Sequence, residues 1–144
     1  MTISLRFLLA LAVSAVAAAC AAAPEAGGQN DTRSRTAIVL AWTRSGGLAG
    51  FCDQLELTAT GDVTAKSCKT SGARTRQLSS DERRRLDELR QELGSVAVTS
   101  SDHATADAMS QTLTLKGTGS RQPSEAQRQE LLDWAQRVYS NTIR

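Results

Sequence analysis

Apolar positions along this chain fall first into strand-like runs and later into helix-like ones. Ala37–Thr43 is almost wholly apolar and rich in β-formers, which predicts a strand buried on both faces. Phe51–Thr58 and Asp62–Lys69 flank a short polar break and are predicted to form a hairpin. Further along, Val96–Thr99 is a candidate short strand, and the alternation over Met109–Lys116 predicts a half-buried strand.

The two cysteines of the predicted hairpin select its register. If Cys52 faces Cys68, the connection is the three-residue loop 59–61, and Leu57 faces Val63 on an apolar side. A two-residue turn would instead set Leu57 against a lysine and stagger the cysteines. Because the first register separates apolar from polar side chains, the sequence predicts a Cys52–Cys68 disulfide, which would stabilise the fold by about 3 kcal/mol.

Two later segments carry the signatures of capped amphipathic helices. The first is predicted over Ser79–Leu93, where its first residue and Glu82 form a capping box and Gly94 ends the helix. The second is capped by Ser124, with Gln127 reaching back to the cap. Its predicted buried stripe is Leu131, Trp134, Ala135 and Val138, flanked by Leu132 and Tyr139.

This order of elements predicts a single α+β domain over residues 36–144. Antiparallel strands followed by amphipathic helices are typical of a small antiparallel sheet, here of about four strands, with both helices packed on one face. On the first helix, Arg83–Asp87 and Arg84–Glu88 are predicted ion pairs. The basic run on that helix is therefore interpreted as a solvated face rather than a contact for anionic lipid.

The first nineteen residues differ from the rest of the chain. A short start ending in Arg6 precedes the apolar run Phe7–Ala19, which is too short to span a bilayer but suits a secretory signal peptide. Residues 20–35 show no hydrophobic period and are predicted to form a flexible tether. The sequence therefore predicts an exported protein whose folded part begins near Thr36.

Small residues directly before Cys20 resemble the lipobox of bacterial lipoproteins, in which this cysteine becomes the acylated first residue. Cleavage by an ordinary signal peptidase among the alanines is the alternative. The chain has three cysteines, so assigning Cys20 to lipid leaves a pair for one disulfide, as expected in an oxidising compartment. We therefore expect a membrane-anchored lipoprotein of the cell envelope, held by more than one acyl chain.

Composition and charge narrow the classes of function. Lys and Arg number 17 against 15 Asp and Glu, which excludes a strongly basic nucleic-acid-binding protein. His103 is the only histidine and has no further ligand at metal-binding spacing, so we expect neither a metal site nor a Ser-His-Asp hydrolase. The serines lack a nucleophile elbow, and no glycine-rich segment carries the Lys of a phosphate-binding loop. We expect a non-enzyme without a cofactor, a small-molecule substrate or a nucleic-acid partner.

Between the first two predicted strands lies a glycine-rich segment, Arg44–Gly50, with the sequence RSGGLAG. This segment resembles the signature of the emfourin family. These are small bacterial proteins named for an inhibitor of protealysin, a thermolysin-like zinc metalloprotease. The later order of a leucine-spaced helix, an alternating strand and a C-terminal amphipathic helix is similar as well, so the resemblance covers about Ile38–Tyr139. Its specific part is Arg44, Ser45, Gly46, Gly47, Leu48, Ala49 and Gly50.

The resemblance implies an inhibitor that blocks the active-site cleft of a thermolysin-like metalloprotease. Leu48 is the expected anchor, because such enzymes favour bulky apolar groups beyond the scissile bond, and the three glycines are expected to set the backbone. One alternative is that the glycines merely connect two strands and Leu48 caps the core. Another is a non-inhibitory envelope module that uses the same fold to bind a partner protein. The expected protease contacts are Arg44, Ser45, Leu48 and Ala49.

Overall fold

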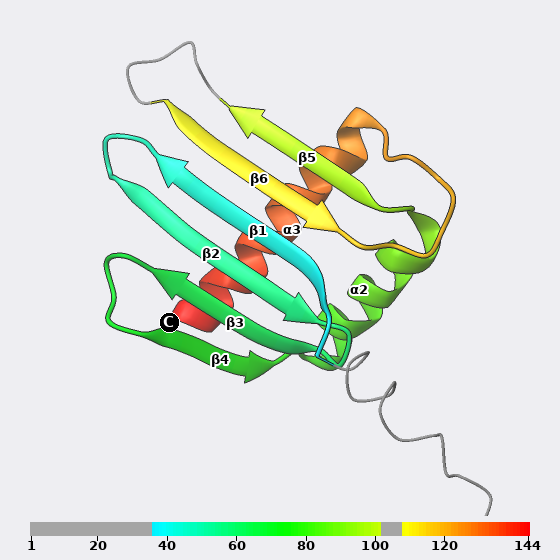
Figure 1. Cartoon of the computed structure of the whole chain (residues 1–144), viewed down its shortest axis with the longest axis horizontal. Helices are drawn as coiled ribbons and strands as arrows, with labels where there is room; N and C mark the ends of the chain where they lie inside the picture. The colour runs from blue at the N-terminus through cyan, green and yellow to red at the C-terminus, as the bar shows by residue number, and fades with distance from the viewer. Residues whose placement is uncertain (1–35, 102–107) are drawn as a thin grey trace, which may run out of the picture.

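A computed structural model describes residues 36–101 and 108–144, which form a six-stranded antiparallel sheet and two helices (Figure 1). Across the sheet the order is β4-β3-β2-β1-β6-β5, so the first strand lies in the middle, beside the last. The helices are α2 (Ser80–Glu92) and α3 (Glu125–Ile143). The strands are β1 (Ile38–Gly46), β2 (Phe51–Thr58), β3 (Asp62–Ser67), β4 (Ala73–Gln77), β5 (Val96–Ser101) and β6 (Met109–Leu115).

The predicted α+β class is confirmed, but the sheet is larger than predicted, with six strands in place of about four. The strand that the sequence did not reveal is β4, whose residues ARTRQ show no apolar alternation and are exposed at four of five positions. It forms because β3 offers a partner, with Thr64 opposite Thr75 and Asp62 opposite Gln77. Pairing with a neighbour, rather than its own pattern, makes this segment a strand.

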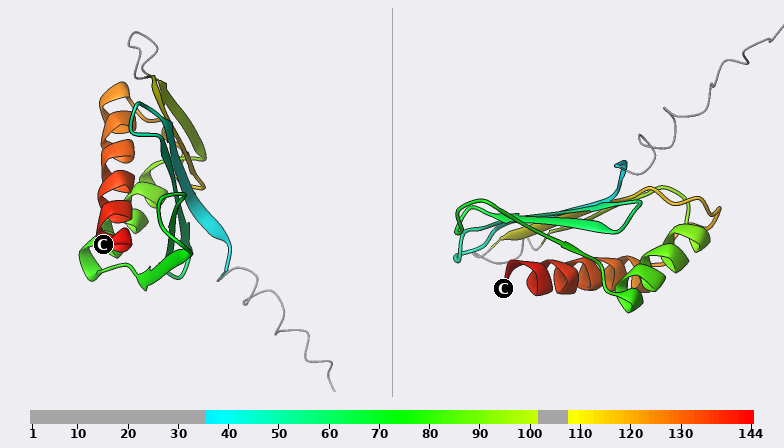
Figure 2. Two further views of the ribbon diagram at one scale, coloured as in Figure 1. Left: turned by 90° about the vertical axis from the view of Figure 1, so that its left-hand side faces the viewer. Right: turned by 90° about the horizontal axis from the view of Figure 1, so that it is seen from below.

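Both helices lie on one face of the sheet, and no described element covers the other face (Figure 2). This arrangement corrects the prediction that the first strand is buried on both faces. Leu40 and Trp42 of β1 are buried in the core, whereas Thr43 and Ser45 are exposed on the open face. Val39, at 5% exposure, also belongs to the core cluster, and it lies where the pairing of β1 with β2 shifts register between Ile38 and Leu40.

The β2–β3 hairpin has the predicted register. Leu57 lies opposite Val63, and both side chains are fully buried. Cys52 and Cys68 form the predicted disulfide, with their Cα atoms 5.7 Å apart. Gly61 has a φ of +87°, the left-handed conformation that this three-residue connection favours.

Both helices begin at the predicted capping boxes. The Ser79 hydroxyl accepts the Glu82 N–H while the Glu82 carboxylate accepts the Ser79 N–H, and Ser124 and Gln127 do the same at α3. These reciprocal bonds satisfy amide groups that have no partner within the helix. The predicted apolar stripe of α3 is buried, and so are the two residues that flank it.

The arginine run on α2 makes ion pairs that differ in part from the prediction. Arg83 pairs with Asp87 as predicted, whereas Arg84 pairs with Asp81 and not with Glu88. Residues three and four positions apart are both neighbours on a helix surface, so spacing alone does not choose between them.

The connection after β6 caps the carboxyl end of α2 with hydrogen bonds from its backbone. The Thr118 and Gly119 N–H groups donate to the Arg90 carbonyl at 2.7 and 3.2 Å, and Gly119 also donates to the Leu93 carbonyl at 2.9 Å. A Cβ at Gly117 or Gly119 would come within 1.9 or 2.3 Å of a backbone oxygen at this helix end. Only glycine permits so close an approach, which gives the last carbonyls of α2 their partners.

The predicted signal peptide, the predicted tether with Cys20, and His103 lie outside the described residues. Within the described ranges, neither helix combines the length and the apolar character needed to cross a membrane. The first described residue, Thr36, precedes β1 and so lies at the opposite end of this strand from the β1–β2 turn.

Candidate functional site

The segment predicted as a binding loop divides into a strand end and a tight turn. Arg44, Ser45 and Gly46 belong to β1, and Gly47–Gly50 forms the turn into β2. The last amide of the turn donates to its first carbonyl at 2.8 Å. In chain order the three glycines of the segment have φ of +90°, +73° and +58°, a backbone conformation that other residues rarely adopt.

Leu48 lies in the turn with 86% of its surface exposed. The alternative in which Leu48 caps the core is therefore wrong. Ile38, at the opposite end of β1, is the only other large apolar side chain exposed in the described ranges, at 38%. A single exposed leucine is common on protein surfaces. Whether Leu48 indicates a binding site therefore depends on how firmly the turn beneath it is held.

On one side the turn is held by the residue that leads into β6. The Gly47 N–H donates to the Ala108 carbonyl at 2.9 Å. A Cβ at Gly46 would lie 2.5 Å from the same carbonyl oxygen, so this approach of two backbones requires glycine. The base of the turn is thus fixed against the neighbouring strand.

On the other side the turn is held by residues that follow β3. The Cys52–Cys68 disulfide joins the beginning of β2 to this segment, and the Cys68 N–H donates to the Cys52 sulfur at 3.0 Å. The next residue, Lys69, donates from its ammonium group to the Ala49 carbonyl within the turn. The same ammonium lies 5.1 Å from the centre of the Phe51 ring, a cation–π contact. The disulfide therefore positions a side chain that contacts the turn directly.

Arg44 lies beneath the turn, in a polar cluster at the edge of the core. Its Nε and Nη2 donate to Asp53 Oδ2 at 3.0 and 2.5 Å, and the Tyr139 hydroxyl donates to Oδ1 at 2.6 Å. Burial opposes ionisation of Asp53, which is 4% exposed, but hydrogen bonds from Tyr139 and Arg44 outweigh it, so the pKa of this carboxyl lies below its ordinary value. The cluster joins β1, β2 and α3 below the turn.

The predicted contact residues are therefore divided among three places. Leu48 and Ala49 lie together in the turn and are exposed. The Arg44 side chain is only 14% exposed and is engaged with Asp53. Ser45 is exposed on the open face of the sheet, opposite Cys52 in β2. The structure leaves the turn itself, rather than the whole seven-residue segment, as the candidate site.

Asp53, Tyr139 and Lys69 support this site and were not predicted to do so. The sequence held a signal for Asp53, because it shares the inward alternation of Leu55 and Leu57, and an acid on a buried face needs a partner. No local signal could link Asp53 to Tyr139, since 86 positions separate them along the chain. Lys69 follows Cys68, so the predicted hairpin register and disulfide already bring it to the beginning of β2, but no sequence pattern indicates its contact with the turn.

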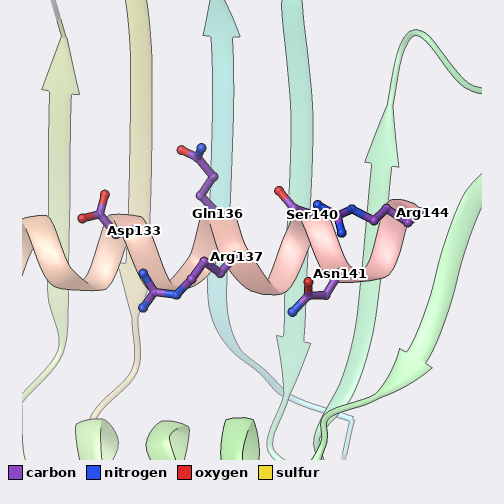
Figure 3. A pocket seen from close by; sticks show the side chains of 6 residues that line it. All are labelled: Asp133, Gln136, Arg137, Ser140, Asn141 and Arg144. Atoms are coloured by element: carbon purple, nitrogen blue, oxygen red, sulfur yellow. The ribbon is translucent and has the colours of Figure 1, made fainter.

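A polar hollow of about 400 Å³ lies on the outer side of α3 (Figure 3). All its lining side chains are polar and come from this helix and its C-cap, so the hollow is a solvated helix face. Over residues 36–101 and 108–144, no three His, Cys, Asp or Glu side chains gather as metal ligands. The lining residues are Asp133, Gln136, Arg137, Ser140, Asn141 and Arg144.

No family model, curated protein or solved structure matches the chain.

Proposed function

We propose that this protein is a non-enzymatic component of the cell envelope that inhibits a thermolysin-like metalloprotease through its β1–β2 turn. Leu48 and Ala49 make the contact, and an acylated Cys20 holds the protein at the membrane. The observation that carries the proposal is the 86% exposure of Leu48 on a turn that is held from two sides.

The apolar side chain in the turn suits a protease cleft. Leu48 would fill the pocket that normally receives a bulky apolar side chain of the substrate. The turn is already held by the Gly47–Ala108 hydrogen bond and by Lys69, so it loses little conformational entropy when it docks. Burial of one leucine side chain supplies about 1.5–3 kcal/mol of the binding energy.

The same support favours inhibition over cleavage. A substrate has to lie extended through the cleft, whereas Gly47–Gly50 is closed by its own hydrogen bond. Extending the turn would also break the Lys69–Ala49 contact and strain the chain against the Cys52–Cys68 disulfide. The turn therefore occupies the cleft without presenting an extended scissile segment.

The membrane anchor in this proposal is supported by the pairing of cysteines. The disulfide takes two of the three cysteines of the chain, which leaves Cys20 for acylation. A disulfide also fits an exported protein, since it persists in oxidising compartments.

The test is a titration of the exported chain, carrying Cys20→Ser and an intact disulfide, against a thermolysin-like metalloprotease that cleaves a small peptide. We expect saturable inhibition by the otherwise unchanged chain. Leu48→Asp is expected to weaken inhibition at least about 100-fold, because an ionised carboxylate would have to enter an apolar pocket. Its free energy of unfolding should stay within about 0.5 kcal/mol, since Leu48 is exposed.

Ala126→Asp is the matched control, because it adds the same charge at an exposed alanine in the first turn of α3. We expect this variant to inhibit normally. Equal effects of the two substitutions would show that charge, and not the turn, controls inhibition. A folded, uncut protein that inhibits none of several such enzymes would instead favour the non-inhibitory envelope module.

A further inference from the structure

The Cys52–Cys68 disulfide lies on the open face of the sheet, beside the candidate site. The inward alternation of Leu55 and Leu57 along β2 sets Cys52 on the opposite face, which no described element covers (Figure 2). Cys68 directly follows β3 and is exposed, whereas Cys52 is half-buried. The bond can therefore be approached from solvent, and Cys68 is the more accessible partner.

The disulfide connects the β1–β2 turn to the β3–β4 connection. The turn ends directly before β2, and the β3–β4 connection begins at Cys68. Its next residue, Lys69, donates to the Ala49 carbonyl of the turn and lies 5.1 Å from the centre of the Phe51 ring. The hairpin register brings the two connections near each other, and the covalent bond limits how far they can separate.

The core of the domain does not include this disulfide. Neither cysteine belongs to the cluster of buried apolar side chains. The pairing of β2 with β3 extends from Asp53 opposite Ser67 to Leu57 opposite Val63, and the last two side chains are fully buried. Breaking the S–S bond therefore leaves the hairpin and the core in place, and its main effect falls on the two connections.

We propose that Cys52–Cys68 is a thiol–disulfide exchange site through which a protein dithiol controls the inhibitory turn. In the oxidised chain, Lys69 is held on the Ala49 carbonyl and orders the turn. In the reduced chain, the β3–β4 connection separates from the turn and inhibition weakens. This inference rests on the proposed function, because it assigns a regulation to the same turn.

The reductant is a protein of the class that carries two cysteines in a Cys-x-x-Cys motif. Such a dithiol completes the exchange itself, so no mixed disulfide remains on this chain. The uncovered face of the sheet gives a protein of this size access to Cys68 (Figure 2).

The exchange proceeds in two displacements. A thiolate of the dithiol attacks the exposed Cys68 sulfur, the S–S bond breaks, and its electron pair leaves on the Cys52 sulfur. The Cys68 N–H donates to that sulfur at 3.0 Å, and a donor of this kind stabilises the negative charge that develops there. The second thiolate of the dithiol then displaces Cys68 from the mixed disulfide. The dithiol is oxidised to a disulfide, and its two protons pass through solvent to the sulfurs of Cys52 and Cys68.

The experiment is hydrogen exchange followed by NMR on the exported chain carrying Cys20→Ser, either oxidised or reduced with excess dithiothreitol. The Gly50 amide, bonded to the Gly47 carbonyl at 2.8 Å, reports on the turn. The Gly61 amide, bonded to the Thr58 carbonyl at 3.0 Å, is the matched control at the opposite end of β2. We expect reduction to speed exchange at least about tenfold at Gly50 and less than about twofold at Gly61. In the protease titration, reduction should weaken inhibition at least about tenfold, because the turn must then be ordered on docking.

Lys69→Met tests whether the disulfide acts through this lysine, since the substitution removes the ammonium group and keeps the S–S bond. We expect the oxidised variant to match the reduced unsubstituted chain in Gly50 exchange and in inhibition, with little further effect of dithiothreitol. Lys66→Met changes an exposed lysine of β3 and should behave like the unsubstituted chain.

Three results would overturn the inference. The first is a disulfide that dithiothreitol leaves intact in the folded protein, as alkylation of free thiols would show. The second is an equal change of exchange at Gly50 and Gly61 on reduction, and the third is inhibition that reduction leaves unchanged. An oxidised chain that inhibits no such protease would instead refute the proposed function, and Gly50 exchange would still decide whether reduction loosens the turn.

Discussion

Gly46 and Gly50 stand at the two ends of the exposed turn. Replacing each of them with alanine separates two reasons for glycine, which are a positive φ and a close contact with the backbone. Both glycines have positive φ, +90° and +58°, so alanine is strained at either one. At Gly46 an added Cβ would also lie 2.5 Å from the Ala108 oxygen, whereas at Gly50 nothing lies within 4 Å. The two variants therefore differ chiefly in a collision with backbone.

The expected losses of stability follow from the positive φ and the close contact. Left-handed backbone costs alanine about 1–2 kcal/mol, and the stiffer unfolded chain offsets about 0.4–1 kcal/mol of that. Gly50→Ala should therefore lower the free energy of unfolding by about 1 kcal/mol or less. Gly46→Ala must also displace the Ala108 carbonyl from its hydrogen bond with Gly47, which adds about 1 kcal/mol and brings the loss to about 2 kcal/mol.

Urea unfolding followed by tryptophan fluorescence measures both losses. Trp42 and Trp134 are 1% and 7% exposed, so their emission will change when the core opens. The slope of free energy against urea should be the same in both variants, because the same surface is exposed on unfolding. Equal losses, or a smaller loss at Gly46, would refute the reasoning, since the Ala108 oxygen would then not approach Gly46 closely in solution.

Two further predictions concern the ion pair between Arg76 of β4 and Glu82 of α2, and the predicted membrane anchor. Hydrogen bonds from Arg76 hold the pKa of Glu82 at about 2, down from 4.5, so the carboxylate stabilises the fold above pH 4.5 and loses this effect as the pH falls toward 2. In urea unfolding at pH 7, the free energy of unfolding of the unsubstituted protein should exceed that of Glu82→Gln by about 1–2 kcal/mol, and this difference should vanish by about pH 2. A difference that stays constant with pH would contradict this reasoning. Cys20→Ser should move the protein from the membrane pellet to the soluble fraction after ultracentrifugation, and a protein that still sediments with membranes would exclude the lipid anchor.

Sequence reasoning succeeded where local chemistry decides the structure. Ser79 and Ser124 open helices because each can accept a backbone N–H and each has a reciprocal partner three residues later. The register of the β2–β3 hairpin followed from a single choice, since only one pairing both joins Cys52 to Cys68 and places Leu57 on an apolar face. These features depend on neighbours within a few residues or across one short turn.

The features that sequence reasoning missed depend on distant partners. β4 shows no strand pattern and exists because β3 pairs with it. The three glycines that follow Arg44 predict a loop there. In the structure its side chain is bonded to Asp53 of β2, and the same carboxylate accepts a hydrogen bond from Tyr139 of α3. The candidate site could thus be located from its glycines, while its support could not, because the supporting side chains converge only in the folded sheet.

Because β1 lies between β2 and β6, the first strand of the chain cannot complete its pairing until the last strand has joined the sheet. Thr43 and Thr112 of these neighbouring strands have hydroxyl oxygens 2.6 Å apart, yet 69 positions separate them along the chain. Strands β1 to β4 can pair through successive short hairpins, but closing β6 onto β1 requires a long loop to be ordered first. The speed of folding therefore depends on that closure, and until it occurs β1 is an open strand edge available to other unfolded chains.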